Sequence, residues 1–87
     1  MDLNEAIINT YMPHVTIIST LKVIFKGQAE SIIFPGDMGV FEVMAYHKQI
    51  MSRLLKGNIE IDGNLFPIAR GIMKVEKNNV TIVIEEL

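Results

Sequence analysis

Apolar and polar residues alternate with a period of two over most of this 87-residue chain. The alternation begins at Val15, and the residues that follow are rich in Val, Ile, Thr and Phe, which is typical of strands buried on one face. Residues 26–28 (Lys-Gly-Gln) and 35–37 (Pro-Gly-Asp) interrupt this pattern and predict two turns. A strand over residues 29–34 is expected between them.

Two β-hairpins are predicted in the second half of the chain. The alternating segment 59–66 contains Asp62-Gly63, a pair that accepts the positive φ angles of a type I′ turn. Residues 71–76 and 80–84 are predicted to form the two strands of the second hairpin, with Lys77-Asn78-Asn79 as its turn. Asn tolerates the left-handed conformation, which explains the Asn pair in this turn. Short strands separated by such turns predict an all-β fold, a single small sandwich or flattened barrel of antiparallel strands.

Residues 43–56 have a different period. Their apolar positions recur at helical spacing, and Gly57 stands where a helix C-cap is expected. These positions are Val43, Tyr46, His47, Ile50, Met51, Leu54 and Leu55. The pattern alone therefore predicts a helix over residues 43–56.

The first 13 residues form an N-terminal extension that precedes a domain of residues 14–87. Asp2 and Glu5 have the spacing of a capping box, and Leu3, Ile7 and Tyr11 recur every four residues. This predicts a short helix over residues 3–11, which Pro13 would end. Because a helix below about 12 residues is marginal unless it docks, an unstructured tail is the alternative.

Composition excludes several functional classes. A net charge of −2 argues against nucleic-acid binding, and no run approaches the ~18 apolar residues of a membrane span, so direct membrane insertion is not expected. The acidic N-terminus is unlike a secretory signal. The sequence shows no phosphate-binding glycine motif, and neither His14 nor His47 has acidic residues at metal-ligand spacing. We therefore predict no catalytic residue, no metal and no cofactor, and expect that the protein is not an enzyme.

Several motifs in one order resemble a known family. The stretches 21–27 and 29–36 match a strand, a Phe-x-Gly turn and a second strand that ends in Pro-Gly, and Gly39, Phe41, Val43 and His47 follow in register. Residues 54–57, 71–75 and 78–82 add further matches. Together they resemble the N-terminal β-sandwich domain of the epsilon subunit of F-type ATP synthase, over residues 15–87. Glu42, Ala45, Tyr46 and Gln49 replace the glycines and prolines of the family's signature around His47.

This resemblance changes the expectation for residues 43–56. In the family, the corresponding stretch is a loop with a short turn, followed by a strand. We therefore favour a helical turn near residues 46–50 and a strand near residues 51–55 over the continuous helix.

The resemblance also implies a function. It implies a non-catalytic rotor subunit of the central stalk that links the gamma subunit to the membrane c-ring and couples ion-driven rotation to ATP synthesis. Such a subunit is peripheral, at the cytoplasmic face of the membrane, in the F1 sector. The family's C-terminal helical hairpin is not present before Leu87, so no ATP binding is expected. The alternative is a stand-alone β-domain that binds a peptide or a small ligand.

The resemblance finally implies contact residues. Contacts with the c-ring are expected at Asp37, Met38, Gly39 and Val40, with Asp62 and Gly63 as a second contact. Contacts with gamma are expected at Met44, Tyr46 and His47.

Overall fold

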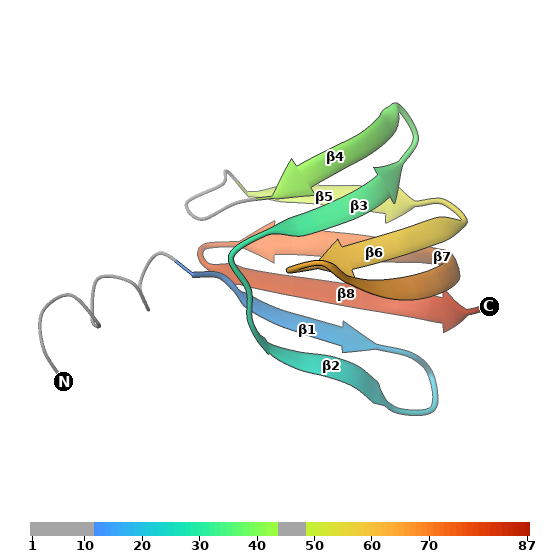
Figure 1. Ribbon diagram of the computed structural model, residues 1–87, viewed down its shortest axis with the longest axis horizontal. Helices are drawn as coiled ribbons and strands as arrows, with labels where there is room; N and C mark the ends of the chain where they lie inside the picture. The colour runs from blue at the N-terminus through green and yellow to red at the C-terminus, as the bar shows by residue number, and fades with distance from the viewer. Residues whose placement is uncertain (1–11, 44–48) are drawn as a thin grey trace, which may run out of the picture.

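The computed structural model describes residues 12–43 and 49–87, and the predicted N-terminal helix lies outside them. The described residues contain strands and no helix, which confirms the all-β prediction (Figure 1). The strands are β1 (His14–Ile18), β2 (Val23–Gln28), β3 (Ile32–Gly36), β4 (Gly39–Val43), β5 (Ile50–Leu54), β6 (Gly57–Ile61), β7 (Asn64–Glu76) and β8 (Asn79–Glu86).

The strands form a two-layered sandwich that β7 joins together. Strands β2, β1, β8, β7 and β5 follow one another in the first layer, and β3, β4 and β6 lie across it (Figure 1). The first residues of β7 pair with β6, whereas its later residues pair with β5 and β8. The register shifts between Ile68 and Arg70, and such a bulge bends a strand. The bulge lets one 13-residue strand contribute to both layers.

Every strand pair is antiparallel except β1 with β8, which are parallel from His14 opposite Asn79 to Ile18 opposite Val83. No turn joins these two strands, because they come from the two ends of the described chain. The sequence pattern therefore did not predict this pair. The pairing with β8 places β1 second from the edge of the first layer, between β2 and β8.

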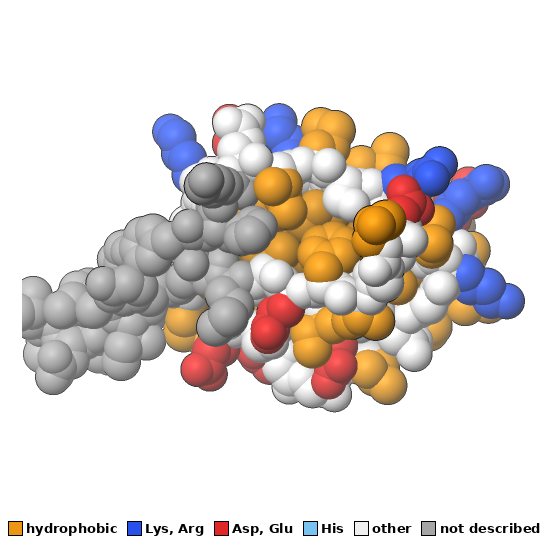
Figure 2. Space-filling model, turned by 90° about the horizontal axis from the view of Figure 1, so that it is seen from above, with side chains coloured by type: hydrophobic (Ala, Val, Ile, Leu, Met, Phe, Trp, Pro, Cys, Tyr) orange, Lys and Arg blue, Asp and Glu red, His pale blue; other side chains and the backbone are white. Residues whose placement is uncertain are grey.

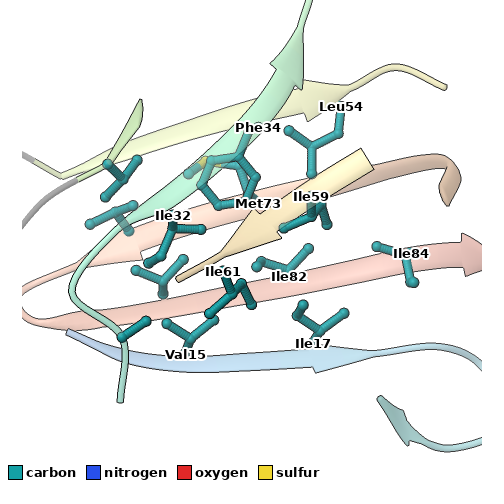
Figure 3. Packing of buried hydrophobic residues seen from close by; sticks show 14 of the residues in the cluster. Val15, Ile17, Ile32, Phe34, Leu54, Ile59, Ile61, Met73, Ile82 and Ile84 are labelled. Carbon is teal, nitrogen blue, oxygen red and sulfur yellow. The ribbon is translucent and has the colours of Figure 1, made fainter. Parts of the chain in front are cut away.

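The core lies between the layers and consists of apolar side chains, which alternate with exposed or partly exposed ones along β1, β3, β6, β8 and the second half of β7 (Figure 3). The ring of Phe34 stacks on that of Phe41 with centroids 5.3 Å apart. None of the described polar or charged residues is buried. The buried side chains are those of Val15, Ile17, Ala29, Ile32, Phe34, Val43, Leu54, Ile59, Ile61, Ile68, Met73, Val75, Val80, Ile82 and Ile84.

The turn predicted at residues 26–28 is wrong, because β2 continues through Gln28 with Gly27 opposite Val15. The chain reverses earlier, between β1 and β2, around Ser19. The Ser19 hydroxyl oxygen accepts hydrogen bonds from the backbone N–H groups of Leu21 (3.2 Å) and Lys22 (3.3 Å). The strand predicted at residues 29–34 accordingly begins later, at Ile32, and continues through Gly36.

Both hairpin turns predicted in the second half are present. Asp62 and Gly63 have φ values of 47° and 86°, as the type I′ prediction requires. In the next turn the positive φ (56°) belongs to Lys77, and the Asn78 side chain instead donates to the backbone oxygen of Met12 (2.9 Å). The prediction that an Asn adopts the left-handed conformation in this turn is therefore wrong. Asn78 instead holds the start of β1 in place through its side-chain hydrogen bond.

The continuous helix predicted over residues 43–56 is wrong, because residues 50–54 form β5. All five residues of β5 pair with β7, from Ile50 opposite Val75 to Leu54 opposite Gly71. Pairing with β7 and burial of Leu54 stabilise a strand here, although the apolar residues recur at helical spacing. The strand that we favoured near residues 51–55 is present, one residue earlier than expected. The helical turn expected near residues 46–50 lies largely outside the described residues, and Ile50 itself is in the strand.

Candidate docking surfaces

The β3–β4 hairpin presents an apolar tip. Asp37 and Met38 form a two-residue turn between Gly36 and Gly39, which has φ 108°. The Met38 side chain is fully exposed, and that of Val40 is 76 % exposed. Figure 1 shows this hairpin at one extremity of the second layer. Exposed apolar side chains on a short turn are suited to a contact with a partner.

The hairpin is braced against the rest of the sandwich. Asp37 forms an ion pair with Arg53 of β5, with 3.1 Å between Oδ2 and Nη2. A Cβ at Gly36 would lie 2.6 Å from the ring of Phe41, so the glycine allows that ring to pack closely. A hollow of about 420 Å³ between the tip and β5 is lined partly by Phe41 and Ile50. The ion pair and the close contact of Gly36 with Phe41 connect the tip to the rest of the sandwich, and the hollow lies beside them.

Asp62 and Gly63 lie at the other end of β3. Ile61 pairs with Ile32 at the start of β3, whereas the β3–β4 turn follows Gly36 at its end. The carboxylate of Asp62 accepts hydrogen bonds from the backbone N–H groups of Glu30 (3.0 Å) and Ser31 (2.9 Å). The structure thus brings residues 37–40 together and places the other predicted ring contact at a separate surface. Met44, Tyr46 and His47 lie outside the described residues.

The two outer faces of the sandwich differ in charge. Lys26, Arg53, Arg70 and Lys74 point outward from the first layer, together with Glu76 and Glu85; we call this surface the basic face. Strands β3, β4 and β6 contain no Lys or Arg and carry Glu42 and Glu60 on their outer side, the acidic face. Figure 2 shows most carboxylates along one margin and most Lys and Arg side chains along the opposite margin and one end.

A line of apolar side chains crosses the basic face. Val23 lies opposite Ile18, Ile18 opposite Val83, and Val83 opposite Ile72, so four adjacent strands contribute one residue each to this apolar row. Val83 and Ile72 are 46 % and 55 % exposed. Together with Leu55 they line a groove of about 640 Å³, with Arg53 and Arg70 beside it. Sequence reasoning missed this row because it depends on which strands are neighbours.

Ion pairs partly neutralise the charges of the basic face. Arg70 hydrogen-bonds to Glu85, and this bond together with the carboxylate charge raises the pKa of Arg70. Lys74 contacts Glu76 at 2.9 Å, and the hydrogen bond and charge of the lysine lower the pKa of Glu76. All four side chains are substantially exposed, so solvent screens both pairs. Each pair leaves its cation accessible to a partner's carboxylate.

The described residues provide no site for catalysis by a metal. They contain no cluster of three or more His, Cys, Asp or Glu residues arranged to hold an ion. Within residues 12–43 and 49–87 no helix has the length and apolarity to cross a membrane.

Comparisons with known proteins agree with this fold. The family model for the ATP synthase delta/epsilon chain beta-sandwich domain matches residues 12–87. The ATP synthase epsilon chain of Bordetella avium is 30 % identical over 76 residues, covering 80 % of this chain and 53 % of that protein. That of Chlorobaculum tepidum is 29 % identical over 76 residues, covering 82 % of this chain and 86 % of that protein. This chain therefore spans about half the length of the Bordetella relative and most of the Chlorobaculum one.

Solved structures share the fold. A chain of the mitochondrial ATP synthase of Euglena gracilis superposes with a TM-score of 0.80 at 20 % identity, covering 87 % of this chain and 52 % of that chain. A chain from the central stalk and c-ring structure of the Tetrahymena thermophila enzyme gives 0.74 at 13 % identity, covering 84 % and 63 %. Since the family model spans residues 12–87, the chain belongs to the family of ATP synthase delta/epsilon chain β-sandwich domains.

Proposed function

We propose that this protein is a non-catalytic subunit of the central stalk of an F-type ATP synthase, in which it links the gamma subunit to the c-ring. The observation that carries the proposal is the family match over the whole sandwich, residues 12–87. The protein would be peripheral to the membrane, on its cytoplasmic face, and held there by the other rotor subunits.

The contact with the ring is assigned to the β3–β4 hairpin. Met38 and Val40 are large apolar residues of this hairpin and are mostly exposed. Apolar side chains of this kind exclude water from the centre of an interface. The Asp37–Arg53 ion pair connects the hairpin to β5 in the other layer. Asp62 and Gly63 lie at the opposite end of β3, and the carboxylate of Asp62 is already engaged by two backbone donors. A partner surface at the hairpin end would therefore touch residues 37–40 and leave residues 62–63 free.

The subunit's contribution to rotation is mechanical. Ion flow turns the ring, and the stalk must turn with it, so a body between ring and gamma has to resist shear. A close-packed apolar core joined by a strand shared between the layers provides such a body. The contact with gamma is assigned to Met44, Tyr46 and His47, in the segment that connects β4 to β5.

Binding experiments with the partners test this role. The 87-residue protein is titrated by calorimetry against the gamma subunit of the same genome and against a purified gamma–ring complex. We expect one-to-one binding to both, and tighter binding to the complex. A well-folded protein that binds neither would refute the proposal.

A pair of matched variants separates the ring contact from the gamma contact. Met38→Glu places one charge on the tip, and Leu65→Glu makes the same single change at a 60 % exposed site near the other end of the sandwich. The tip variant should lose at least ~10-fold in affinity for the gamma–ring complex and retain its affinity for gamma, since desolvating a charge in an interface is costly. Leu65→Glu should bind like the unmodified protein.

A further inference from the structure

Strand β4 has one edge without a neighbouring strand in the described part of the chain. It is the last strand of the sheet order and pairs with β3 alone. The other terminal strand, β2, carries Lys26, and its pairing with β1 contains a register shift. Lysine, proline and bulges keep an edge strand from pairing with another chain. Residues 39–43 of β4 contain none of these, so its edge is open to a further strand.

Hydrogen bonds of β3 show which of its backbone groups point toward β4. The backbone oxygen of Ser31 accepts a hydrogen bond from the N–H of Asp62 (3.0 Å), and that of Pro35 accepts one from the N–H of Leu55 (2.9 Å). A residue in an antiparallel strand directs its N–H and C=O to the same neighbour, and successive residues alternate between the two neighbours. The odd-numbered residues of β3 therefore point away from β4, and its even-numbered residues point toward it.

The same alternation continues in β4. Phe34 lies opposite Phe41, so Phe41 bonds to β3, and the N–H and C=O groups of Val40 and Glu42 point to the free edge. Val40 and Glu42 are both exposed. The edge thus offers a backbone donor and a backbone acceptor at each of these two positions.

We propose that this edge is occupied by β4 of a second copy of the chain, paired antiparallel about a two-fold axis beside Phe41. Val40 of each copy then lies opposite Glu42 of the other, and each such pair exchanges two N–H···O bonds. The same surface is used by both copies, so the assembly closes as a dimer. The proposal concerns the free protein and does not depend on the role in the stalk.

The side chains are compatible with this register. Glu42 meets the apolar Val40 of the other copy, so no like charges lie directly opposite each other. The two Phe41 side chains meet at a non-hydrogen-bonded position, where side chains lie closest, and aromatic pairs there are favourable. Each Phe41 ring also lines the hollow of about 420 Å³ beside β5, so contact between the rings removes apolar surface from water. Figure 2 looks onto the side of the molecule where β4 lies in Figure 1, and apolar side chains gather there.

The neighbouring two-fold registers are less favourable. An axis at Glu42 places the two carboxylates directly opposite each other, and like charges in that position are destabilising. An axis at Val40 places Glu42 opposite Met38, which lies in the β3–β4 turn and cannot extend the ladder. The axis at Phe41 uses the edge groups of both Val40 and Glu42 without opposing like charges.

Concentration-dependent measurements on the full chain test the pairing. Strand addition through so few residues gives a small interface and a weak contact, so sedimentation and amide hydrogen exchange are recorded from about 20 µM to about 1 mM. We expect a monomer–dimer equilibrium in this range. The amide hydrogens of Val40 and Glu42 should exchange several-fold more slowly as the concentration rises, whereas those of Phe41 and Val43 are already bonded to β3 and should change little. A monomer at every concentration, or a dimer that protects other amides instead, would overturn the proposal.

Charge variants at Val40 test the register. Val40→Lys places a cation opposite Glu42 of the other copy, Val40→Glu places a carboxylate there, and the two-fold axis doubles either effect. The dissociation constant of the dimer should therefore be at least ~10-fold lower for Val40→Lys than for Val40→Glu at low salt. Leu65→Lys and Leu65→Glu, at a 60 % exposed site, are the matched controls and should both associate like the unmodified protein. Equal dissociation constants for the two Val40 variants, or the same difference between the two Leu65 variants, would overturn the proposal.

Discussion

Replacing Asp62 by alanine should destabilise the sandwich more than its position in an exposed turn suggests. Asp62 has two roles in the structure. Its carboxylate accepts hydrogen bonds from the N–H groups of Glu30 and Ser31, which connects the β6–β7 turn to the link between β2 and β3. Its backbone has a φ of 47°, in the left-handed region that alanine disfavours.

The size of the effect follows from these two roles. A hydrogen bond to a charged group contributes about 1.5–3 kcal/mol, but these donors are exposed and water can replace the acceptor, so we take roughly 0.5–1 kcal/mol for each. The left-handed backbone costs alanine about 1 kcal/mol or more. Asp62→Ala should therefore lower the free energy of unfolding by about 2–3 kcal/mol. For a domain of this size that corresponds to a fall in Tm of roughly 10–20 °C.

Two companion substitutions separate the roles. Asp62→Gly keeps the backbone conformation accessible and removes the acceptor, so it should cost about 1–2 kcal/mol. Asp62→Asn keeps both the conformation and one acceptor oxygen and should cost less than about 1 kcal/mol. The assay is urea unfolding followed by circular dichroism. The expected order of destabilisation is Ala, then Gly, then Asn; Ala and Gly variants of equal stability would refute the backbone argument, and three neutral variants would refute both.

Three other substitutions have defined outcomes. Gly36→Ala should cost about 1–3 kcal/mol in urea unfolding, because the added Cβ would lie 2.6 Å from the Phe41 ring; a change below 0.5 kcal/mol would mean that the ring yields freely. Phe34→Ala should cost about 3–5 kcal/mol by the same assay, because it empties a fully buried site and removes the stack with Phe41; a loss under about 1 kcal/mol would contradict that packing. Lys74 lowers the pKa of Glu76 in the folded protein, so this pair contributes stability above the ordinary pKa of glutamate that is lost as pH falls through the lowered value. Lys74→Met should therefore reduce the loss of stability between pH ~5 and ~3, and an unchanged pH profile would exclude this linkage.

Local chemistry explains which turns could be predicted. The turn at Asp62-Gly63 follows from two adjacent residues whose backbone preferences match a type I′ turn. The turn after β1 contains neither Gly nor Pro and depends on the Ser19 hydroxyl, a weaker signal. Gly27 suggested a turn but lies within β2, where a Cβ would make an ordinary contact at 3.5 Å with the ring of Phe25. Gly63 therefore lies in a turn, as predicted, whereas Gly27 lies within a strand.

Non-local pairing explains what could not be predicted. The apolar tip at Met38 follows from the Pro-Gly-Asp turn signal, because a two-residue turn exposes its side chains. The apolar row needs the parallel pairing of β1 with β8, which places Ile18 beside Val83. The period of two shows that Val83 and Ile72 share the outward side of their strands, but it cannot show that they are neighbours on one surface.

The separation of charge between the two faces is not required by the fold. In each strand the inward positions form the core, and the outward positions are free to carry either sign at little cost. Exposed ion pairs contribute only about 0–1 kcal/mol, so interspersed charges would serve stability as well or better. Segregated charge instead acts at a distance, because it orients an approaching partner before contact. In the role proposed above, in which the protein joins gamma and the ring in one orientation, such an asymmetry would be useful, whereas a domain with uniform faces would be guided by its contacts alone.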